Sequence, residues 1–365
     1  MIQQLIDRYK RIRTERFHVQ TYQYSYAFVG MGQHSLTNLY PVLHYLGVPL
    51  KYICVTSERK LQLIERKFPH VKATTSLDMI LKDDEVKGVF VSASPSAHFF
   101  IASQVLQSGK SLFIEKPPCQ SLQELDALND QQRLYGIPEH SSPTRSLSPV
   151  AMVGLQKRYA PAVQTLQKRL RKEELVSYDL HYLTGAYPEG NALLDLYIHP
   201  IDLVCFLFGT PDIIACQQIS PASYILMLRH PNIIGTLELS TSYTWTSAEE
   251  SLKVCTSKGI YRLSQMDELT FEPKPSIILG FPIEKIHKYN KNIEHLYARN
   301  NFTPLLPNNQ LYSQGYFNEI RAFIDAVESR KIHVLTDLQS VRTIYEVISK
   351  IQEIKVHSSY SHSAH

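Results

Sequence analysis

The sequence predicts two domains, an amino-terminal α/β domain with a parallel sheet and a carboxyl-terminal α+β domain with a mostly antiparallel sheet. The chain of 365 residues corresponds to two domains at roughly 150 residues each. Short apolar runs alternate with helix-like stretches between residues 25 and 150, which implies right-handed βαβ crossovers. Beyond residue 160, strand-like runs follow one another across short turns, as in antiparallel sheets.

The first half opens with a basic amphipathic helix over residues 2–17, where apolar side chains recur at steps of three and four. We expect it to pack on its own domain or on a partner subunit, and not on a membrane. Strands are expected at 26–29, 51–55, 87–92 and 111–114, with helices at 57–68 and 96–108. Gly109 would end the second helix, and Ser121 with Glu124 makes a capping box for the next one. Residues 137–149, with three prolines and four serines, predict a loop before a strand at 151–155.

The second half is expected to begin with a helix at 160–172. Strands follow at 175–183, 213–219, 223–229, 233–241, 251–256 and 259–263. An apolar helix at 192–208 interrupts them, and Pro200 should break it near His199. Residues 272–312, rich in Pro and Asn, predict irregular structure. Helices are expected at 315–329 and 337–355, the last with Thr336 and Gln339 at capping-box spacing.

Composition excludes several classes of protein. The net charge is +4, and residues 1–20 carry +3 of it, from five basic and two acidic side chains. That is too little for nucleic-acid binding through bulk charge. No apolar run reaches the ~18–20 residues that span a bilayer, and the start lacks the apolar core of a secretory signal. Five scattered cysteines without a CxxC pair favour reduced thiols in a cytoplasmic protein. The histidines of the terminal HSSYSHSAH lack a ligand framework, so we expect no metal site.

The first chemical motif is Gly30-Met31-Gly32-Gln33-His34-Ser35, directly after the first strand. A dinucleotide site uses the first glycine for a tight turn, the second for close approach to the pyrophosphate and the third for helix packing. Ser35 takes the third place, and its small side chain can keep the packing role. The alternative is a plain strand–helix turn that binds nothing.

The end of the second strand bears on the choice between NAD and NADP. An acidic residue there would bind the ribose hydroxyls of NAD, whereas this chain has Thr56 and Ser57, with Arg59 and Lys60 after them. Hydroxyls and cations favour the 2′-phosphate of NADP. Glu58 leaves NAD open, and a solvated turn is the alternative without a ligand.

The second motif is Glu115-Lys116-Pro117-Pro118 at the end of the fourth strand. A lysine at a strand's carboxyl end lies at the rim where open α/β sheets bind ligands. The two prolines stiffen the backbone and stop the strand. The alternative is a surface lysine before a turn.

The third motif is the pair Asp195 and His199, four residues apart in an apolar helix and hence on one face. Buried polar side chains of this kind must be hydrogen-bonded or functional. An aspartate can hold the imidazole in one tautomer and poise it as a base near neutral pH. The alternative is a structural core histidine.

Four segments in this order, AFVGMGQHS, SASPSAHFFIASQVLQSGKSLFIEKPP, MVGLQKRYAPAV and LLDLYIHPIDLVCFLFG, resemble the Gfo/Idh/MocA oxidoreductases over residues 26–355. The resemblance implies a Rossmann domain and an α+β substrate domain whose open sheet forms a homo-oligomer, a dimer or tetramer. It also implies hydride transfer between NAD(P) and a secondary alcohol or ketone of a sugar, cyclitol or nucleotide sugar.

Carried over by residue, Lys116 matches the lysine that orients the substrate hydroxyl, Asp195 the aspartate that binds the sugar, and His199 the general acid/base. Lys157, Arg158 and Tyr159 lie where the family's crossing strand nears the substrate. Of these, Arg158 is an expected substrate contact, together with Lys116, Asp195 and His199. The expected cofactor contacts are Gly30, Met31, Gly32, Gln33, His34, Thr56, Ser57, Arg59, Ser94, Pro95, His98, Glu115 and Lys116.

The chain departs from the family pattern in a few places. Tyr197 stands where a glycine is usual, Gly190-Asn191-Ala192 replaces a glycine pair, and the 137–149 loop is longer. We expect a helical extension over 1–24, the Rossmann domain over 25–157, the substrate domain over 158–333, and a last helix over 334–365 that packs back on the Rossmann domain. A cofactor-binding sensor without activity, and a lyase or hydrolase that oxidises its substrate transiently, remain the alternative functions.

Overall fold

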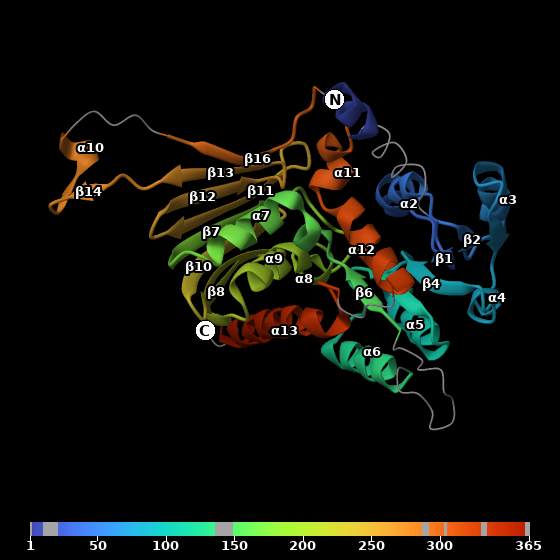
Figure 1. The fold of residues 1–365 in the computed structure, drawn as a ribbon. Coiled ribbons are helices and arrows are strands. Elements are labelled where there is room, and N and C mark those ends of the chain that lie inside the picture. Colours follow the sequence, from blue (N-terminus) through green and yellow to red (C-terminus); the bar gives the residue numbers. More distant parts are fainter. Residues whose placement is uncertain are drawn as a thin grey trace. The chain divides into compact units, whose positions relative to one another are not determined.

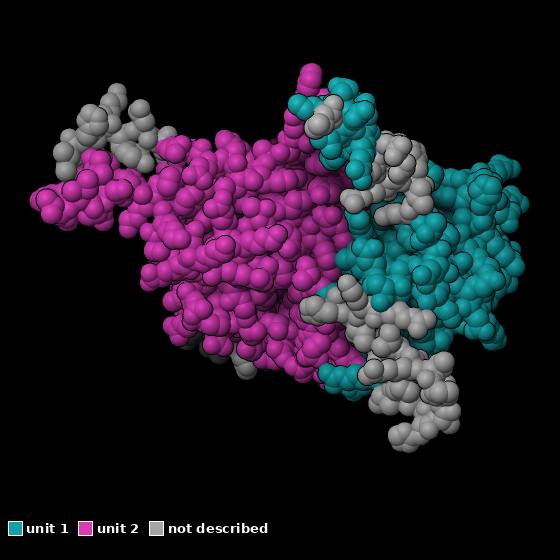
Figure 2. All heavy atoms as spheres, viewed as in Figure 1, with its two compact units in different colours: residues 1–114, 130–152, 320–334 teal, residues 115–129, 153–319, 335–365 magenta. Residues whose placement is uncertain are grey.

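The computed structural model describes residues 2–9, 21–135, 149–286, 292–302, 305–329 and 334–361. It divides into two compact units (Figure 2). Unit 1 holds residues 1–114, 130–152 and 320–334, and unit 2 holds residues 115–129, 153–319 and 335–365. This division into units does not test the predicted domain boundaries after residues 24, 157 and 333, which stay predictions. Residues 2–9 are helical, while the rest of the predicted 2–17 helix and all but the last residue of the 137–149 loop lie outside the described residues.

A six-stranded sheet in the order β3-β2-β1-β4-β5-β6 carries the first half of the fold (Figure 1). Its strands are β1 Ser25–Val29, β2 Leu50–Cys54, β3 Lys72–Thr74, β4 Val86–Val91, β5 Ser111–Glu115 and β6 Ala151–Gly154. The pairs of β1 with β2 and β4, of β2 with β3 and of β4 with β5 are all parallel. The parallel sheet is therefore confirmed. Its strand order reverses between β1 and β4, which is where such sheets bind ligands.

The helices between these strands are α2 Tyr40–Leu46, α3 Glu58–Lys67, α4 Leu77–Leu81, α5 Pro95–Gln107 and α6 Leu122–Leu134, and a π-helical turn, η1 Ser35–Leu39, precedes α2. Gly109 takes φ +73° just after α5, as predicted for a helix end. At α6 the Glu124 N–H donates to Ser121 Oγ at 3.2 Å, and the Glu124 carboxylate accepts from the Gln120 N–H at 2.7 Å. The first hydrogen bond of the predicted capping box is thus confirmed. In the second, the Glu124 carboxylate binds the N–H of Gln120 and not that of Ser121.

The core of unit 1 is aromatic. Phe90 on β4 packs against Phe113 on β5 at 5.4 Å between ring centroids. Phe323, from α12 Tyr316–Ser329, lies edge-on to Phe90 at 5.1 Å. The later part of α12 therefore covers the sheet of unit 1, although it lies more than 200 residues from these strands in the sequence.

Unit 2 is built on an eight-stranded sheet in the order β16-β13-β12-β11-β7-β10-β9-β8. Its strands are β7 Leu175–Leu183, β8 Asp212–Ser220, β9 Ser223–His230, β10 Ile233–Ser240, β11 Glu249–Thr256, β12 Gly259–Ser264, β13 Glu268–Pro273 and β16 Glu294–Ala298. Only one of the pairings described here is parallel, that of β7 with β10. The α+β class with a mostly antiparallel sheet is thus confirmed.

Helices cover one face of this sheet (Figure 1). They are η2 Gln156–Tyr159, α7 Pro161–Leu170, α8 Ala192–Asp195, α9 Ile198–Phe208 and α13 Leu338–Ser361. Phe208 of α9 stacks on Tyr178 of β7 at 4.6 Å, and α13 packs on α9 and β8. On the other face Ile225, Met227 and Ile234 are each more than 40% exposed.

The predicted 192–208 helix needs a correction. It is two helices, α8 and α9, separated at Leu196 and Tyr197. Because α9 begins at Ile198, the predicted break or restart near His199 is confirmed. Pro200 is the third residue of α9, where its missing N–H costs no intrahelical hydrogen bond.

The prediction of irregular structure over residues 272–312 also needs a correction. This segment contains β16, which pairs with β13 at the sheet edge, together with β14 Ile277–Ile278, β15 Phe281–Pro282, α10 Ile283–Ile286, η3 Leu306–Asn308 and α11 Gln310–Ser313. The strands β3 and β13 and the helix α4 were not predicted either. At the last helix Asp337, and not Thr336, accepts from the Ser340 N–H at 2.8 Å. Single-residue shifts of this kind depend on tertiary packing, which periodicity does not contain.

Candidate functional site

The glycine turn after β1 has two glycines with different structural roles. Gly30 takes φ +102°, and a Cβ there would lie 2.1 Å from the Ser92 carbonyl oxygen. Only glycine fits this position. A Cβ on Gly32 would meet no heavy atom within 4 Å, so its backbone is open to a ligand. Ser35 is buried and donates through Oγ to Ser92 Oγ at 3.0 Å. The serine therefore ties the turn to the end of β4.

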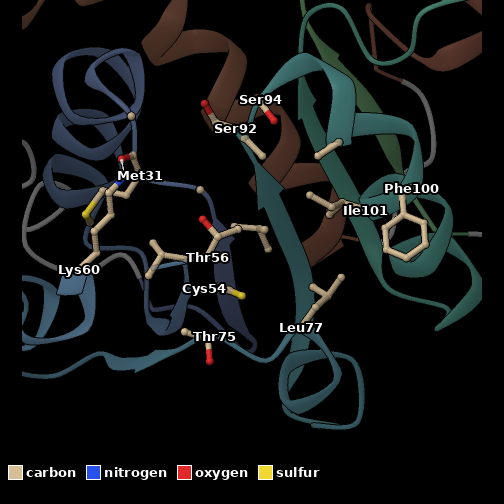
Figure 3. Close-up of a pocket in the computed structure, with 16 residues that line it drawn as sticks. Met31, Cys54, Thr56, Lys60, Thr75, Leu77, Ser92, Ser94, Phe100 and Ile101 are labelled. Atoms are coloured by element: carbon tan, nitrogen blue, oxygen red, sulfur yellow. Dashed lines mark hydrogen bonds between the residues drawn. The ribbon is translucent and has the colours of Figure 1, made fainter. Parts of the chain in front are cut away.

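A cavity of about 580 Å³ opens beside this turn (Figure 3). In Figure 3 Lys60 and Met31 lie at one side and Phe100 and Ile101 at the other, with Thr56 between them. Its walls come from the carboxyl ends of β1, β2 and β4 and from α3 and α5, the usual ligand position in a doubly wound sheet. The open Gly32 backbone and this cavity together fit half of a dinucleotide.

Five of the predicted cofactor contacts line this cavity: Gly30, Met31, Gly32, Thr56 and Ser94. Lys60, which the sequence offered only beside Arg59, also lines it and donates through Nζ to the Met31 carbonyl oxygen at 3.3 Å. The register of α3 decides between these two cations, and that depends on how the helix packs.

The other predicted cofactor residues of unit 1 lie outside the lining as the structure describes it: Gln33, His34, Ser57, Arg59, Pro95 and His98. His98 is buried and pairs through Nε2 with the Ala93 carbonyl oxygen at 3.1 Å, which shapes the loop from within. Arg59 is exposed on α3. Glu115 and Lys116 belong to unit 2.

Lys116 and Asp195 meet in unit 2. The Lys116 Nζ donates to the Asp195 carbonyl oxygen at 2.6 Å. The Tyr187 hydroxyl donates to Asp195 Oδ2 at 3.4 Å, and a Cβ on Gly190 would lie 2.3 Å from that same oxygen. The Asp195 carboxylate thus occupies the space beside a glycine that could bear no side chain. His199 follows as the second residue of α9, with 8% of its surface exposed.

The charges around Lys116 change its proton affinity. Burial lowers the pKa of the Lys116 ammonium, the nearby carboxylates of Glu115 and Asp195 oppose that change, and the positive charge of Lys157 adds to it. Lys157 is itself buried, paired with Glu250 and placed 4.9 Å from the Tyr182 ring centroid. A buried lysine with a lowered pKa can exchange a proton at a less alkaline pH than a free lysine.

Arg158 is occupied by protein groups. Its Nε and Nη2 donate to Asp202 Oδ1 at 2.9 and 2.6 Å, and its Nη1 donates to the Leu335 carbonyl oxygen at 2.6 Å. The side chain of Asp202 is only 1% exposed. These contacts tie η2 and α9 to the start of the last helix and argue against the predicted substrate contact, because the donors are already engaged. Tyr159 also holds this segment, with its hydroxyl accepting from the Leu335 N–H at 3.0 Å.

Tyr197, which replaces a usual glycine, points into the protein core. It is fully buried, its hydroxyl donates to the Ala222 carbonyl oxygen, and its ring lies edge-on to Tyr182 and Tyr224 at 6.1 and 6.3 Å. The larger side chain is therefore accommodated by packing against tyrosines of the sheet.

Residues 24–135 match the oxidoreductase family with an NAD-binding Rossmann fold. This match is to the model of the Gfo/Idh/MocA family, over the amino-terminal part of the chain. The chain is 24% identical to the putative oxidoreductase YceM of Salmonella typhimurium, over 67% of this chain and 70% of that protein. It is 20% identical to the scyllo-inositol 2-dehydrogenase (NAD(+)) of Bacillus subtilis, over 72% and 73%. These relatives are named as oxidoreductases and dehydrogenases, which supports a dehydrogenase or reductase.

Solved structures share its fold. A dehydrogenase from Chromobacterium violaceum superposes with a TM-score of 0.76 at 19% identity, over 94% of this chain and 99% of that one. KijD10, a 3-ketoreductase from Actinomadura kijaniata in complex with TDP-benzene and NADP, gives 0.69 at 14% identity, over 90% and 96%. GenD2 from gentamicin A biosynthesis, in complex with NAD, gives 0.68 at 19%, over 91% and 93%. Within the described part of the chain, no helix combines the length and apolarity needed to cross a membrane.

Proposed function

We propose that this protein transfers a hydride between NAD(P) and a secondary alcohol or ketone carbon of a sugar, cyclitol or nucleotide sugar. The observation that carries the proposal is the contact of Lys116 Nζ with the Asp195 backbone, beside a carboxylate that Tyr187 and Gly190 fix in place. A relative named for scyllo-inositol and a structural neighbour named as a 3-ketoreductase support a polyhydroxylated substrate.

The proposed reaction needs a proton acceptor and a positive charge at one oxygen atom. The bound nicotinamide supplies the hydride chemistry. His199 takes the hydroxyl proton as general base, while the Lys116 ammonium stabilises the negative charge that develops on that oxygen. Asp195 accepts a hydrogen bond from a neighbouring substrate hydroxyl and so orients the reacting carbon. Reduction uses the same groups, with the proton returning from His199.

The roles are tested with His199→Ala and Lys116→Ala, using a panel of sugars, cyclitols and nucleotide sugars with both cofactors. We expect each change to lower kcat by about 10²–10⁴-fold, the usual range for a general acid/base, while cofactor affinity stays unchanged. Lys168→Ala, on the exposed side of α7, is the control. Normal turnover by His199→Ala would show that the base is another group. If the cofactor stays bound and substrate is consumed with no net change in added cofactor, the lyase or hydrolase alternative is favoured. If the cofactor binds but no substrate is turned over, the sensor alternative is favoured.

We also propose a preference for NADP. Thr56 and Lys60 line the cavity by the glycine turn, and of the residues described as lining it none is acidic. Lys60→Gln should weaken NADPH binding about tenfold and leave NADH binding unchanged, with Arg59→Gln, one residue away and exposed, as the matched control. Tighter binding of NADH than of NADPH by the unchanged protein would refute the preference.

The open face of the unit 2 sheet supports a homodimer as the partner arrangement. Strand registers place Lys253 of β11 beside Asp179 of β7 at the middle of the sheet. A neighbouring row of paired residues runs from Arg229 of β9 on one side of the sheet to Glu272 of β13 on the other. In the proposed dimer, the open faces of two copies stack on each other about a two-fold axis that runs parallel to the strands, between β11 and β7. Each strand then lies over the strand of the other copy that is equally far from this centre on the opposite side. This arrangement would set Lys253 over Asp179 and Arg229 over Glu272, opposite charges in both pairs.

Sedimentation velocity over a range of concentrations tests this dimer. Ile234, on the same face and 43% exposed, would be buried, so Ile234→Asp should produce monomers. Leu63→Asp, at a residue of α3 that is 61% exposed, should leave the mass unchanged. A dimer that persists in Ile234→Asp would place the interface elsewhere.

A further inference from the structure

We propose a second sugar-binding subsite beside Asp195, in which Trp245 and Tyr187 stack against a further pyranose ring of the substrate. The inference deepens the proposed function and rests on it, since it makes the substrate a glycoside longer than one ring. The residues concerned all belong to unit 2 and lie in two chain segments, 184–191 and 241–248.

Sheet topology brings the two segments together. The strands β7 and β10 are parallel neighbours, with Leu183 opposite Ser240 at their ends. The segments that follow them therefore leave the same edge of the sheet. The Thr184 N–H donates to the Ser240 carbonyl oxygen at 2.8 Å, and the Tyr243 N–H donates to the Thr184 carbonyl oxygen at 2.9 Å. The first segment then runs into α8 and Asp195.

Trp245 is held in place and yet exposed. Its indole Nε1 donates to the Ala186 carbonyl oxygen at 3.0 Å. The ring lies against Gly185, where a Cβ would come within 2.4 Å of the indole Cδ1. The residue nevertheless keeps 54% of its surface exposed. A large apolar ring that is fixed and left in water forgoes a substantial burial gain, as expected of a surface that binds a ligand.

Tyr187 links this ring to the proposed reaction site. It follows Ala186 directly and donates through its hydroxyl to Asp195 Oδ2. Burial and the Asp195 charge both raise the pKa of the Tyr187 hydroxyl, which keeps it a donor at neutral pH. The distance from the Asp195 carboxylate to the indole is therefore bridged by one tyrosine side chain and one peptide unit. A sugar bound at Asp195 and extended by one ring in this direction would reach Trp245.

Charge favours a neutral sugar over a nucleotide at this subsite. Neither segment contains a lysine or arginine, and Glu189 lies within the first of them. A diphosphate would need cationic donors. The apolar C–H face of a pyranose needs only a flat aromatic surface and hydrogen-bonding groups at its rim, as Trp245 and Tyr187 provide.

Trp245 is the single tryptophan of the chain, so the protein's own tryptophan fluorescence reports this subsite. The NADP⁺-saturated protein would be titrated with glucose, galactose and mannose, with their α- and β-linked disaccharides, and with UDP-glucose. We expect at least one disaccharide to change the emission and to bind about tenfold more tightly than its monosaccharide.

Kinetics then separate stacking from structure. Trp245→Ala should raise KM about tenfold for the disaccharide, with kcat and the monosaccharide KM unchanged, and Trp245→Phe should restore most of the loss. Tyr45→Ala, at an exposed tyrosine of α2, should change nothing. Equal KM values for Trp245→Ala and the unchanged protein would overturn the subsite, as would a response to UDP-glucose alone. Because binding is read without turnover, fluorescence changes with no hydride transfer to any substrate would refute the proposed function and leave the subsite standing.

Discussion

Replacing Arg158 with methionine distinguishes a structural arginine from a substrate-binding one. The side chain of Arg158 is 6% exposed and that of its partner Asp202 is 1% exposed. Two of its nitrogens donate to Asp202, and the third donates to the Leu335 carbonyl oxygen and to Ser340 Oγ. Methionine fills a similar volume and removes all of these donors.

The expected loss of stability follows from what remains. Breaking a buried ion pair from one side costs about 3–5 kcal/mol, because the other charge stays buried without a partner. The Leu335 carbonyl oxygen loses a donor as well, at about 1 kcal/mol. We therefore expect a loss near the upper end of that range. Arg158→Met/Asp202→Leu removes both charges and should regain most of it.

Urea unfolding measures this loss. Trp245 lies in unit 2 together with Arg158 and Asp202, so its fluorescence follows the unit that contains the pair. In the same preparations, KM and kcat are measured with the best substrate of the panel. A stability change below about 1 kcal/mol for Arg158→Met, together with a raised KM, would refute the structural assignment and restore Arg158 as a substrate contact.

Three further changes test the surroundings of the site. Gly190→Ala places a methyl group against the Asp195 carboxylate, and kcat/KM should fall at least tenfold while the urea midpoint stays; an unchanged kcat/KM would remove Asp195 from the mechanism. Burial raises the pKa of Glu319 well above its ordinary value, so its contribution to stability is complete below about pH 4.5 and declines as the pH rises toward the folded-state pKa. From pH 5 upward, the free energy of unfolding of the unchanged protein should therefore fall by about 1.4 kcal/mol per pH unit relative to that of Glu319→Gln. Parallel curves of the two free energies against pH would contradict this. Burial is the main cause of the lowered pKa of Lys116, and the positive charge of Lys157 adds to it. Lys157→Gln removes that charge, so the alkaline limb of the kcat/KM profile should move to higher pH, and a limb that stays would show that Lys116 does not set it.

The sequence placed most elements of both sheets because their signals are local. The four parallel strands from β1 to β5 that it named all fall within one or two residues of their predicted bounds. Two of the strands it missed, β3 and β13, lie near the sheet edges, where few apolar residues mark a strand. Irregular composition also hid β16, whose pairing with β13 depends on a neighbour about 25 residues away.

Among the site residues, residue type and position singled out the glycine turn, Lys116 and Asp195. The structure brings Lys116 and Asp195 together, and their functional roles stay predictions. The sequence could not identify Lys60 over Arg59, because that choice depends on the rotation of α3 against the sheet. Nor could it show that Asp202 occupies the guanidinium of Arg158, 44 residues away, or that Trp245 lies on Ala186, 59 residues away.

By itself, the sequence determined the fold class, the order of the strands along the chain and the motifs that mark the family. Hydrophobic periodicity, glycines and helix caps act over a few residues, and they suffice for that. Only the tertiary structure decided which polar groups are engaged and which remain for a ligand. Hydrogen bonds and burial join residues that are distant in the chain, and these contacts leave Lys60 and Trp245 facing a cavity or solvent while they enclose Arg158, His98 and Tyr197.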